Sequence, residues 1–344
     1  MRRHTNAAAL RVAGTAFVVA VAAVVMAPPS AATGAASCSA KDVPTPIAGA
    51  ADAFVHITVC VPAVARGPLQ ILLPGATYDS TYWDFPVDPE RYSYRRAANA
   101  AGFATLTLDA LGTGASAEPP SLEISGDAQA LAVHDVVSYV RSGIGSYRPG
   151  RIVLVGHSEG SMVAVLEASR FGDVDGLVLT GFSHEVNPVQ SALGSASFIP
   201  ATADPQLGVR YRDPGYLTTR PGSRQAAFYA PASPEPAVVD ADEATKSVMP
   251  AAMTAQALLT IVTPLTRDLR VPVLGVIGRR DSVFCGNSGD CVDDDIFRAR
   301  EAGFYGPAAD YRTYVLPDAG HILNLMSGNA AYRDAVFAWA GRIR

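Results

Sequence analysis

Short apolar runs alternate with amphipathic stretches along most of this chain. Apolar or alternating runs bounded by glycine, proline or polar residues predict strands, and they lie at 53–61, 69–74, 103–108, 152–155, 176–180, 271–277 and 311–316. Apolar residues at helical spacing predict helices at 92–101, 127–141, 161–170 and 330–342. Strands that alternate with helices in this rhythm favour an α/β fold, in which helices cover both faces of a mostly parallel central sheet.

The rhythm fails between residues 183 and 267. This segment is rich in proline and polar turns as far as Pro236, and it then shows helical patterns at 240–245 and 249–261. Such a segment is too long for a loop without structure of its own. We therefore expect a largely helical cap at 183–267, inserted into a core made of residues 37–182 and 268–344.

The N-terminus has the pattern of a secretory signal peptide. Three arginines precede an uncharged apolar run from residue 12 to 27, and small residues and prolines follow. The run is short for a membrane span, so residues 1–36 are predicted to be a signal peptide that is cleaved between Ala31 and Ser37. The mature chain is then secreted and keeps no stable membrane span.

Composition and charge narrow the class of protein. The 344 residues are 49% hydrophobic, which is enough for one large core. Loss of the three signal-peptide arginines moves the net charge from −5 to −8, so the basic footprint of a nucleic-acid-binding protein is absent. Only Lys41 and Lys246 are lysines among 27 basic residues, a bias typical of a GC-rich bacterial genome.

Four cysteines in an exported chain predict disulfide bonds. Cys285 and Cys291 lie six residues apart in a polar loop, which favours a local pair, and Cys38 then pairs with Cys60. The sequence alone also allows the two other pairings. None of the spacings matches a zinc site, and no metal is expected.

An acidic cluster flanks the second cysteine pair. It consists of Asp290, Asp293, Asp294 and Asp295. The spacing of these residues matches no calcium-binding loop. A solvated acidic face is therefore favoured over a cation site.

The pattern that carries chemistry is Gly-His-Ser-Glu-Gly at 156–160. It joins the strand predicted at 152–155 to the helix predicted at 161–170, and its glycines permit a very tight turn. Such a turn exposes the Ser158 hydroxyl at the carboxyl edge of the sheet. A serine hydroxyl is a poor nucleophile until a nearby base takes its proton, and histidine does this near neutral pH.

Position selects one base among the six histidines. His321 follows the last predicted strand on a turn, which can bring its imidazole over Ser158. The others lie in the signal peptide, in a strand, in a helix, inside the tight turn and at the beginning of the cap: His4, His56, His134, His157 and His184. We therefore predict His321 as the general base.

The chain resembles the α/β-hydrolase family. The marks are the turn at 156–160, the loop D-x-x-G-x-G-x-S at 109–116, Asp281 just beyond a late strand and His321 just beyond the last one. Serine, aspartate and histidine follow the order of the family. The resemblance covers nearly all of the mature chain, and it implies a serine hydrolase that needs no cofactor and usually acts on esters.

A carboxylate must orient the imidazole and stabilise its positive charge. Asp281 lies at the end of a predicted strand, forty residues before His321. Asp318 is too close in sequence to His321 for an easy return hydrogen bond, and Glu185 occupies the position that some relatives use instead. We predict Asp281 as the acid; the alternative role for it is an ion pair with Arg279 or its neighbour.

The tetrahedral intermediate of acyl transfer carries an oxyanion that needs two backbone donors. One is expected from Glu159, the residue after the nucleophile, at the beginning of a helix. Relatives commonly have His-Gly-x in the loop that supplies the other, whereas this chain has Pro74, Gly75 and Ala76. Because the donor is an amide, we expect it from Ala76, with Thr77 as the alternative.

Aromatic residues follow this loop. Tyr78, Tyr82, Trp83 and Phe85 are near enough in sequence to wall an acyl pocket. Packing in the interior is at least equally compatible with their positions. Tyr78, Tyr82 and Trp83 are the candidate substrate-binding residues.

These residues together predict a secreted serine hydrolase that cleaves carboxylic esters through an acyl-enzyme intermediate. The expected partner is a small-molecule or lipid ester. The same triad serves lactones, amides, carbon–carbon bonds and perhydrolysis, and the sequence does not separate these reactions. A non-catalytic binding protein on the same fold is disfavoured because all three triad candidates are present.

Overall fold

Eight strands form the central sheet of the computed structural model, which describes residues 1, 36–185, 197–230, 235–254, 260–261, 263, 265–285 and 291–344. In spatial order they are β1 (Ser37–Pro44), β2 (Phe54–Val61), β4 (Thr105–Leu108), β3 (Leu69–Leu73), β5 (Ile152–His157), β6 (Gly176–Thr180), β10 (Val273–Gly278) and β11 (Arg312–Leu316). β2 pairs antiparallel with β1 and β4, and all other neighbours are parallel. The prediction of a mostly parallel sheet is confirmed.

Seven of these strands coincide with the predicted runs, and β1 does not. Only Val43 is buried among the eight residues of β1, so this edge strand carries no apolar pattern that could have predicted it. The chain divides into two units, Met1–Ala32 and Thr33–Arg344, and all the strands and helices named here belong to the second. Residues 2–35 of the predicted signal peptide lie outside the described residues.

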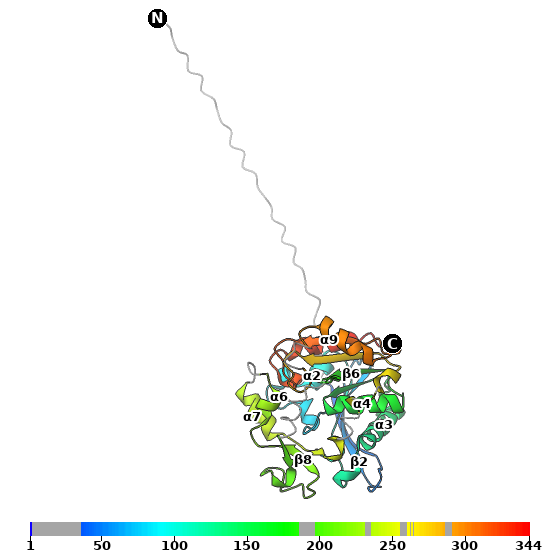
Figure 1. Ribbon diagram of the computed structural model, residues 1–344. Helices are drawn as coiled ribbons and strands as arrows, with labels where there is room; N and C mark the ends of the chain where they lie inside the picture. Colours follow the sequence, from blue (N-terminus) through cyan, green and yellow to red (C-terminus); the bar gives the residue numbers. More distant parts are fainter. Residues whose placement is uncertain are drawn as a thin grey trace. The chain divides into compact units, whose positions relative to one another are not determined.

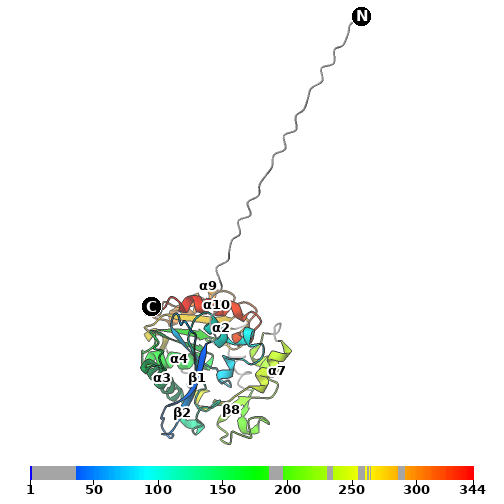
Figure 2. The ribbon, with the colours of Figure 1, turned by 180° about the vertical axis from the view of Figure 1, so that it is seen from behind.

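Helices cover both faces of the sheet, as predicted. They are α1 (Pro89–Tyr92), α2 (Tyr94–Ala100), α3 (Gly126–Ser142), α4 (Glu159–Arg170), α9 (Asp294–Glu301) and α10 (Asn329–Ala340). α3 and α4 lie side by side in both views (Figures 1 and 2). The helix predicted at 92–101 is divided at Ser93, whose hydroxyl accepts a hydrogen bond from the Arg96 amide and begins α2.

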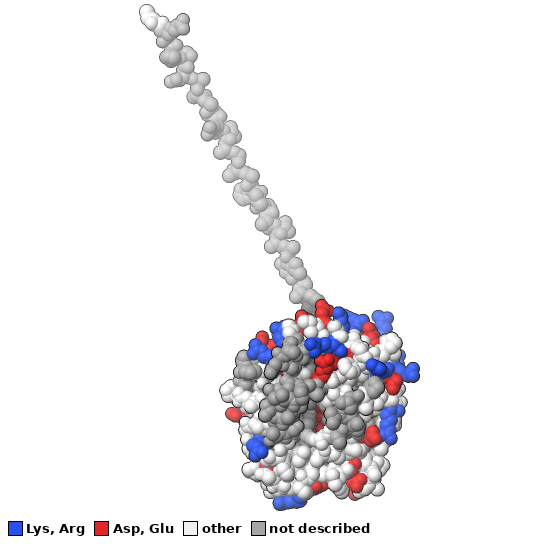
Figure 3. All heavy atoms as spheres, viewed as in Figure 1, with Lys and Arg blue, Asp and Glu red and all other residues white. Residues whose placement is uncertain are grey.

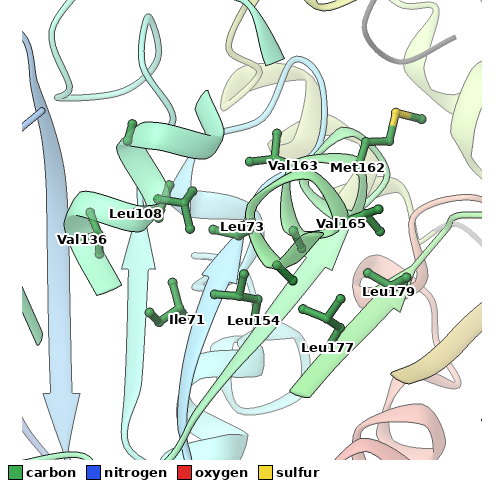
Figure 4. Close-up of a cluster of buried hydrophobic side chains, with 14 of the residues drawn as sticks. Ile71, Leu73, Leu108, Val136, Leu154, Met162, Val163, Val165, Leu177 and Leu179 are labelled. Atoms are coloured by element: carbon green, nitrogen blue, oxygen red, sulfur yellow. The ribbon is translucent and has the colours of Figure 1, made fainter. Parts of the chain in front are cut away.

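Successive residues of the parallel strands point to opposite faces, and each face has its own core. Ile71 and Leu154 belong to the core on the side of α3 and α4 (Figure 4). Their neighbours Leu72 and Val153 belong to a second core with residues of α2 and α10. Burial on both faces explains why these strands appear in the sequence as continuous apolar runs.

The segment 183–267, which was predicted to be a cap, contains both helices and a small sheet in its described part. In its described part the antiparallel strands are β7 (Phe198–Pro200), β8 (Tyr216–Thr219) and β9 (Met249–Pro250), and the helices include α6 (Arg224–Phe228) and α7 (Pro236–Ala244). Residues 252–254 and 260–261 are helical too, within the helix predicted at 249–261. α6, α7 and β8 group on one side of the molecule in Figure 1. The sequence did not predict the sheet, and the helix predicted from Met249 is wrong at its beginning, where β9 lies. Strands of two to four residues are too short to show a period of two.

The structure contains both expected disulfides. Cys38 and Cys60 face each other across β1 and β2, with their Cα atoms 4.1 Å apart. Cys285 and Cys291 form the second bond, on the C-terminal side of β10. Among the described residues, no helix combines the length and apolar character needed to cross a bilayer. On the face drawn in Figure 3, basic and acidic side chains lie interspersed among uncharged ones.

Candidate active site

Ser158 stands between β5 and α4 in a strained backbone conformation. Its φ of 52° and ψ of −115° lie in a region that residues with a side chain rarely adopt. A Cβ at Gly156 would lie 2.5 Å from the Gly160 carbonyl oxygen, and a Cβ at Gly160 would lie 2.4 Å from the Leu73 carbonyl oxygen. The two glycines are therefore needed for the turn, as the sequence pattern predicted.

The structure brings Ser158, His321 and Asp281 together in one chain of hydrogen bonds. His321 Nε2 lies 2.9 Å from Ser158 Oγ, and His321 Nδ1 lies 2.9 Å from Asp281 Oδ2. Both His321 and Asp281 are buried. This arrangement suits a nucleophile, a general base and a carboxylate that holds the base in position.

Asp281 is itself fixed by backbone donors. Its Oδ1 accepts hydrogen bonds from the amides of Val283 (2.9 Å) and Phe284 (3.2 Å), so the other oxygen stays aimed at His321. The two competing carboxylates bind elsewhere. Asp318 pairs with Arg280 at 3.1 Å, and Glu185 pairs with Arg300 at 2.8 Å.

The remaining described histidines have other partners. His56 pairs with Asp42, His134 with Asp173, and His184 with Glu301. His157 points the other way from the nucleophile, with its Nδ1 3.2 Å from Thr180 Oγ1. Burial lowers the pKa of His157 well below its ordinary value, and the neighbouring His321 lowers it further, so His157 stays neutral beside the base.

The loop 74–77 lies directly against the nucleophile. A Cβ at Gly75 would be 3.2 Å from Ser158 Cβ, which shows how closely the two segments approach. A turn closes the loop through a hydrogen bond from the Tyr78 amide to the Gly75 carbonyl. Within the part of the chain that the structure describes, the amides of Ala76, Thr77 and Glu159 have no acceptor. They are the donors available for an oxyanion.

Residues of the 183–267 segment that the sequence did not single out hold this loop. Thr77 has a φ of 63°, and its hydroxyl lies 3.0 Å from Arg224 Nη1. Arg224 and Asp242 are both fully buried, and they pair through two hydrogen bonds of 3.1 and 3.0 Å. The Ser247 amide also donates to the Thr77 carbonyl at 2.9 Å. No local pattern distinguishes these residues, because Arg224 is 147 positions from Thr77.

The cap also contacts the base. The His321 amide donates to the carbonyl of Phe228 at 2.8 Å, and the two rings lie 5.9 Å apart. A Cβ at Gly320 would be 2.6 Å from the same carbonyl oxygen and 2.5 Å from the Ala230 nitrogen. Only glycine at 320 permits this approach, so the end of α6 fixes the backbone that carries His321.

The aromatic residues after the loop have packing partners. Tyr82 stacks on His157 at 4.5 Å, Trp83 meets Tyr94 edge-on at 5.1 Å, and Tyr78 lies 4.2 Å beneath the Arg224 guanidinium. Tyr78, Tyr82 and Trp83 are at most 5% exposed, and Phe85 is buried too. These residues support the site from the interior.

The residues of the 109–116 loop and of the acidic cluster form hydrogen bonds and ion pairs within the fold. Asp109 accepts hydrogen bonds from the amides of Ser80 (2.9 Å) and Ala115 (2.8 Å), which ties the 109–116 loop to the aromatic segment. In the acidic cluster, Asp293 caps α9, Asp294 accepts a hydrogen bond from the Val315 amide and Asp295 pairs with Arg298. Asp290 lies outside the described residues.

Glu159 combines a free amide with a half-buried side chain. Burial raises the pKa of its carboxyl to about 7. The ionised form of the Glu159 carboxyl group, which would put a negative charge beside the nucleophile, is therefore disfavoured. A neutral Glu159 suits a position where an anion would form.

Comparison with known proteins agrees with this architecture. A family model described as the alpha/beta hydrolase family matches residues 70–336. The fold is similar to a thermophilic esterase from Thermogutta terrifontis with malate bound (18% identity, 89% of this chain and 99% of that one, TM-score 0.58). It is also similar to a hydrolase from Pseudomonas aeruginosa (19% identity, 84% and 95%, TM-score 0.58). An enol-lactonase from Burkholderia xenovorans shares it as well (16% identity, 83% and 96%, TM-score 0.54).

No curated protein matches the chain in sequence. The solved structures share the architecture at low identity, so they define the fold and leave the substrate open. The family match covers more than three quarters of the residues and includes the turn at Ser158 and the loop at His321. The chain belongs to the alpha/beta hydrolase family.

Proposed function

We propose that the chain is a serine hydrolase that cleaves carboxylic esters. The observation that carries the proposal is the hydrogen-bonded series Asp281, His321 and Ser158, with the serine at a strained turn. In this arrangement the serine is half-buried and its proton has an acceptor. The free amides of the 74–77 loop and of Glu159 supply the remaining requirement, which is a place for negative charge.

The proposed reaction has two halves. Ser158 Oγ attacks the ester carbonyl carbon while His321 Nε2 takes the hydroxyl proton, and the carbonyl oxygen becomes an oxyanion facing the amides of Ala76 and Glu159. The tetrahedral intermediate then expels the alcohol, which receives the proton from His321. A water molecule repeats the sequence on the acyl-enzyme and releases the acid. Asp281 stabilises the imidazolium in both halves.

We also propose that the 183–267 segment acts as a cap that selects substrates. The contact between Phe228 and His321 supports this role, because it places cap residues beside the reacting atoms. Export of the chain is proposed from its N-terminal pattern, and the two disulfides are consistent with an oxidising compartment.

The test is turnover of p-nitrophenyl esters of graded acyl length, with lactones and anilides in the same panel. Ser158→Ala is expected to reduce ester turnover at least about a thousandfold while the protein stays folded. Ser169→Ala is the matched control, since Ser169 lies in α4, which follows Ser158, and donates to the Leu166 carbonyl, away from His321. Turnover that survives in Ser158→Ala, or labelling of another serine by a fluorophosphonate, would refute the proposal.

A further inference from the structure

A second group of ionisable side chains lies away from Ser158. His134 in α3, Glu167 in α4 and Asp173 just after α4 each offer one ligand atom, and the three atoms lie within 4.8 Å of one another. Glu167 stands eight residues beyond the beginning of α4, which places it about 12 Å further along the helix axis. The group is therefore separate from the triad.

Glu167 is a buried carboxyl group without a hydrogen-bond donor among the described residues. Its side chain is 0% exposed, and neither of its carboxylate oxygens has a hydrogen-bond donor among the described residues. Asp173 Oδ1 has no donor either. Two ionised carboxylates cannot donate to each other, and an uncompensated buried charge is strongly destabilising, so a cation between these oxygens would stabilise the pair.

The group is partly open to solvent on the side of His134 and Asp173. His134 Nδ1 lies 2.7 Å from Asp173 Oδ2, and its ring stacks on Phe171 at 4.0 Å. Arg141 binds the Asp173 backbone carbonyl at 3.1 Å and the Asp175 carboxylate at 3.2 Å, so it does not pair with the Asp173 side chain. The side chains of His134 and Asp173 are 29% and 24% exposed, which gives an ion access from solvent.

We propose that His134, Glu167 and Asp173 bind a zinc ion that fastens α3 to α4. One imidazole nitrogen and two carboxylate oxygens suit Zn²⁺, and three protein ligands leave a fourth position for water on the exposed side. Calcium is disfavoured because it prefers six to eight oxygen ligands. The three ligands come from separate elements at spacings that form no known motif, which explains why no metal was expected from the sequence.

Thermal unfolding with zinc chloride tests the proposal on the protein purified without a histidine tag and stripped with EDTA. One zinc ion per chain is expected to bind, and the midpoint is expected to rise by about 5 °C at a hundredfold excess over the dissociation constant. Glu167→Gln keeps the size of the side chain but removes a ligand and its charge, so it is expected to abolish the shift. His56→Asn is the control, because it removes the imidazole of the exposed His56–Asp42 pair and should leave the shift intact.

Two results would overturn the proposal. One is a midpoint that zinc leaves unchanged in the wild type, or raises equally in the Glu167→Gln variant. The other is an infrared band of a protonated carboxyl group that persists at saturating zinc and is absent from Glu167→Gln, since a proton would then take the place of the cation. Neither readout depends on ester turnover, so the outcome is independent of the proposed function.

Discussion

Arg224 joins the cap to the loop beside Ser158, and its removal should affect stability and catalysis separately. Its guanidinium forms two hydrogen bonds with Asp242 and one with the Thr77 hydroxyl, all between 3.0 and 3.1 Å, in a fully buried position. Arg224→Met keeps much of the apolar stem but leaves the Asp242 charge buried and unpaired. The free energy of unfolding is expected to fall by about 3–5 kcal/mol.

A second substitution separates the two effects. In the Arg224→Met/Asp242→Leu double variant both charges are gone, and apolar replacement of a buried ion pair is often neutral. Most of the lost free energy should return, with a coupling of about 2–3 kcal/mol between the two sites. Thr77 still lacks its donor in this variant. We expect kcat to remain roughly tenfold low, with a smaller change in KM, because a displaced oxyanion donor weakens mainly the transition state.

The assay combines urea unfolding with steady-state hydrolysis of p-nitrophenyl acetate. Arg298→Met is the control, since Arg298 is exposed and pairs only with Asp295 among its described carboxylate neighbours; its unfolding free energy should change by less than about 0.5 kcal/mol. A double variant with wild-type kcat would refute the positioning role of Arg224. A loss below about 1 kcal/mol in Arg224→Met would refute the burial argument. An inactive wild type would count against the proposed function instead.

Two further predictions concern the turn around Ser158. Burial raises the pKa of Glu159 to about 7, so the folded state is favoured while the carboxyl is protonated and loses stability as pH rises from about 4.5 through 7. Glu159→Gln should therefore unfold at a higher temperature than the wild type at pH 8 and at nearly the same temperature at pH 4.5. A difference in unfolding temperature that is equal at the two pH values would contradict this. Gly160→Ala places a Cβ 2.4 Å from the Leu73 carbonyl oxygen and should cost about 2–3 kcal/mol in urea unfolding, whereas a loss below about 0.5 kcal/mol would show that the turn relaxes easily.

The parts of the fold and site that the sequence predicts are those with a local signature. The strand at β5 is apolar on both faces, the turn needs glycines at 156 and 160, and the helix begins at once. These features are adjacent in the sequence, so together they predict where Ser158 lies in the fold. His321 and Asp281 follow from strand ends, because parallel strands bring their carboxyl ends to one edge of the sheet.

The missed features depend on contacts between distant residues. Arg224 is one of 25 arginines in the sequence, and nothing in its neighbours indicates that it is buried against Thr77 and Asp242. β7, β8 and β9 have two to four residues each, so their pairing depends on the fold around them. Ser93 divides one predicted helix in two through a single cap hydrogen bond. In the sequence, Glu167 has no feature that distinguishes it from other helical glutamates. Only the fold brings His134 of α3 and Asp173 close to it.

The contact between Phe228 and His321 has a consequence for exchanging caps between relatives. Insertions of this kind are attractive places to graft a new specificity, because they leave the sheet untouched. Here the grafted segment must supply a backbone carbonyl at the position of Phe228, which accepts the hydrogen bond from the His321 amide. Its backbone must also pass as close to Gly320 as residues 228–230 do, which leaves no space for a side chain at position 320. A graft that replaces only the outer part of the cap and retains 224–230 keeps that brace. A graft that also replaces residues 224–230 would change the specificity, but it would remove the contact that holds His321 in position.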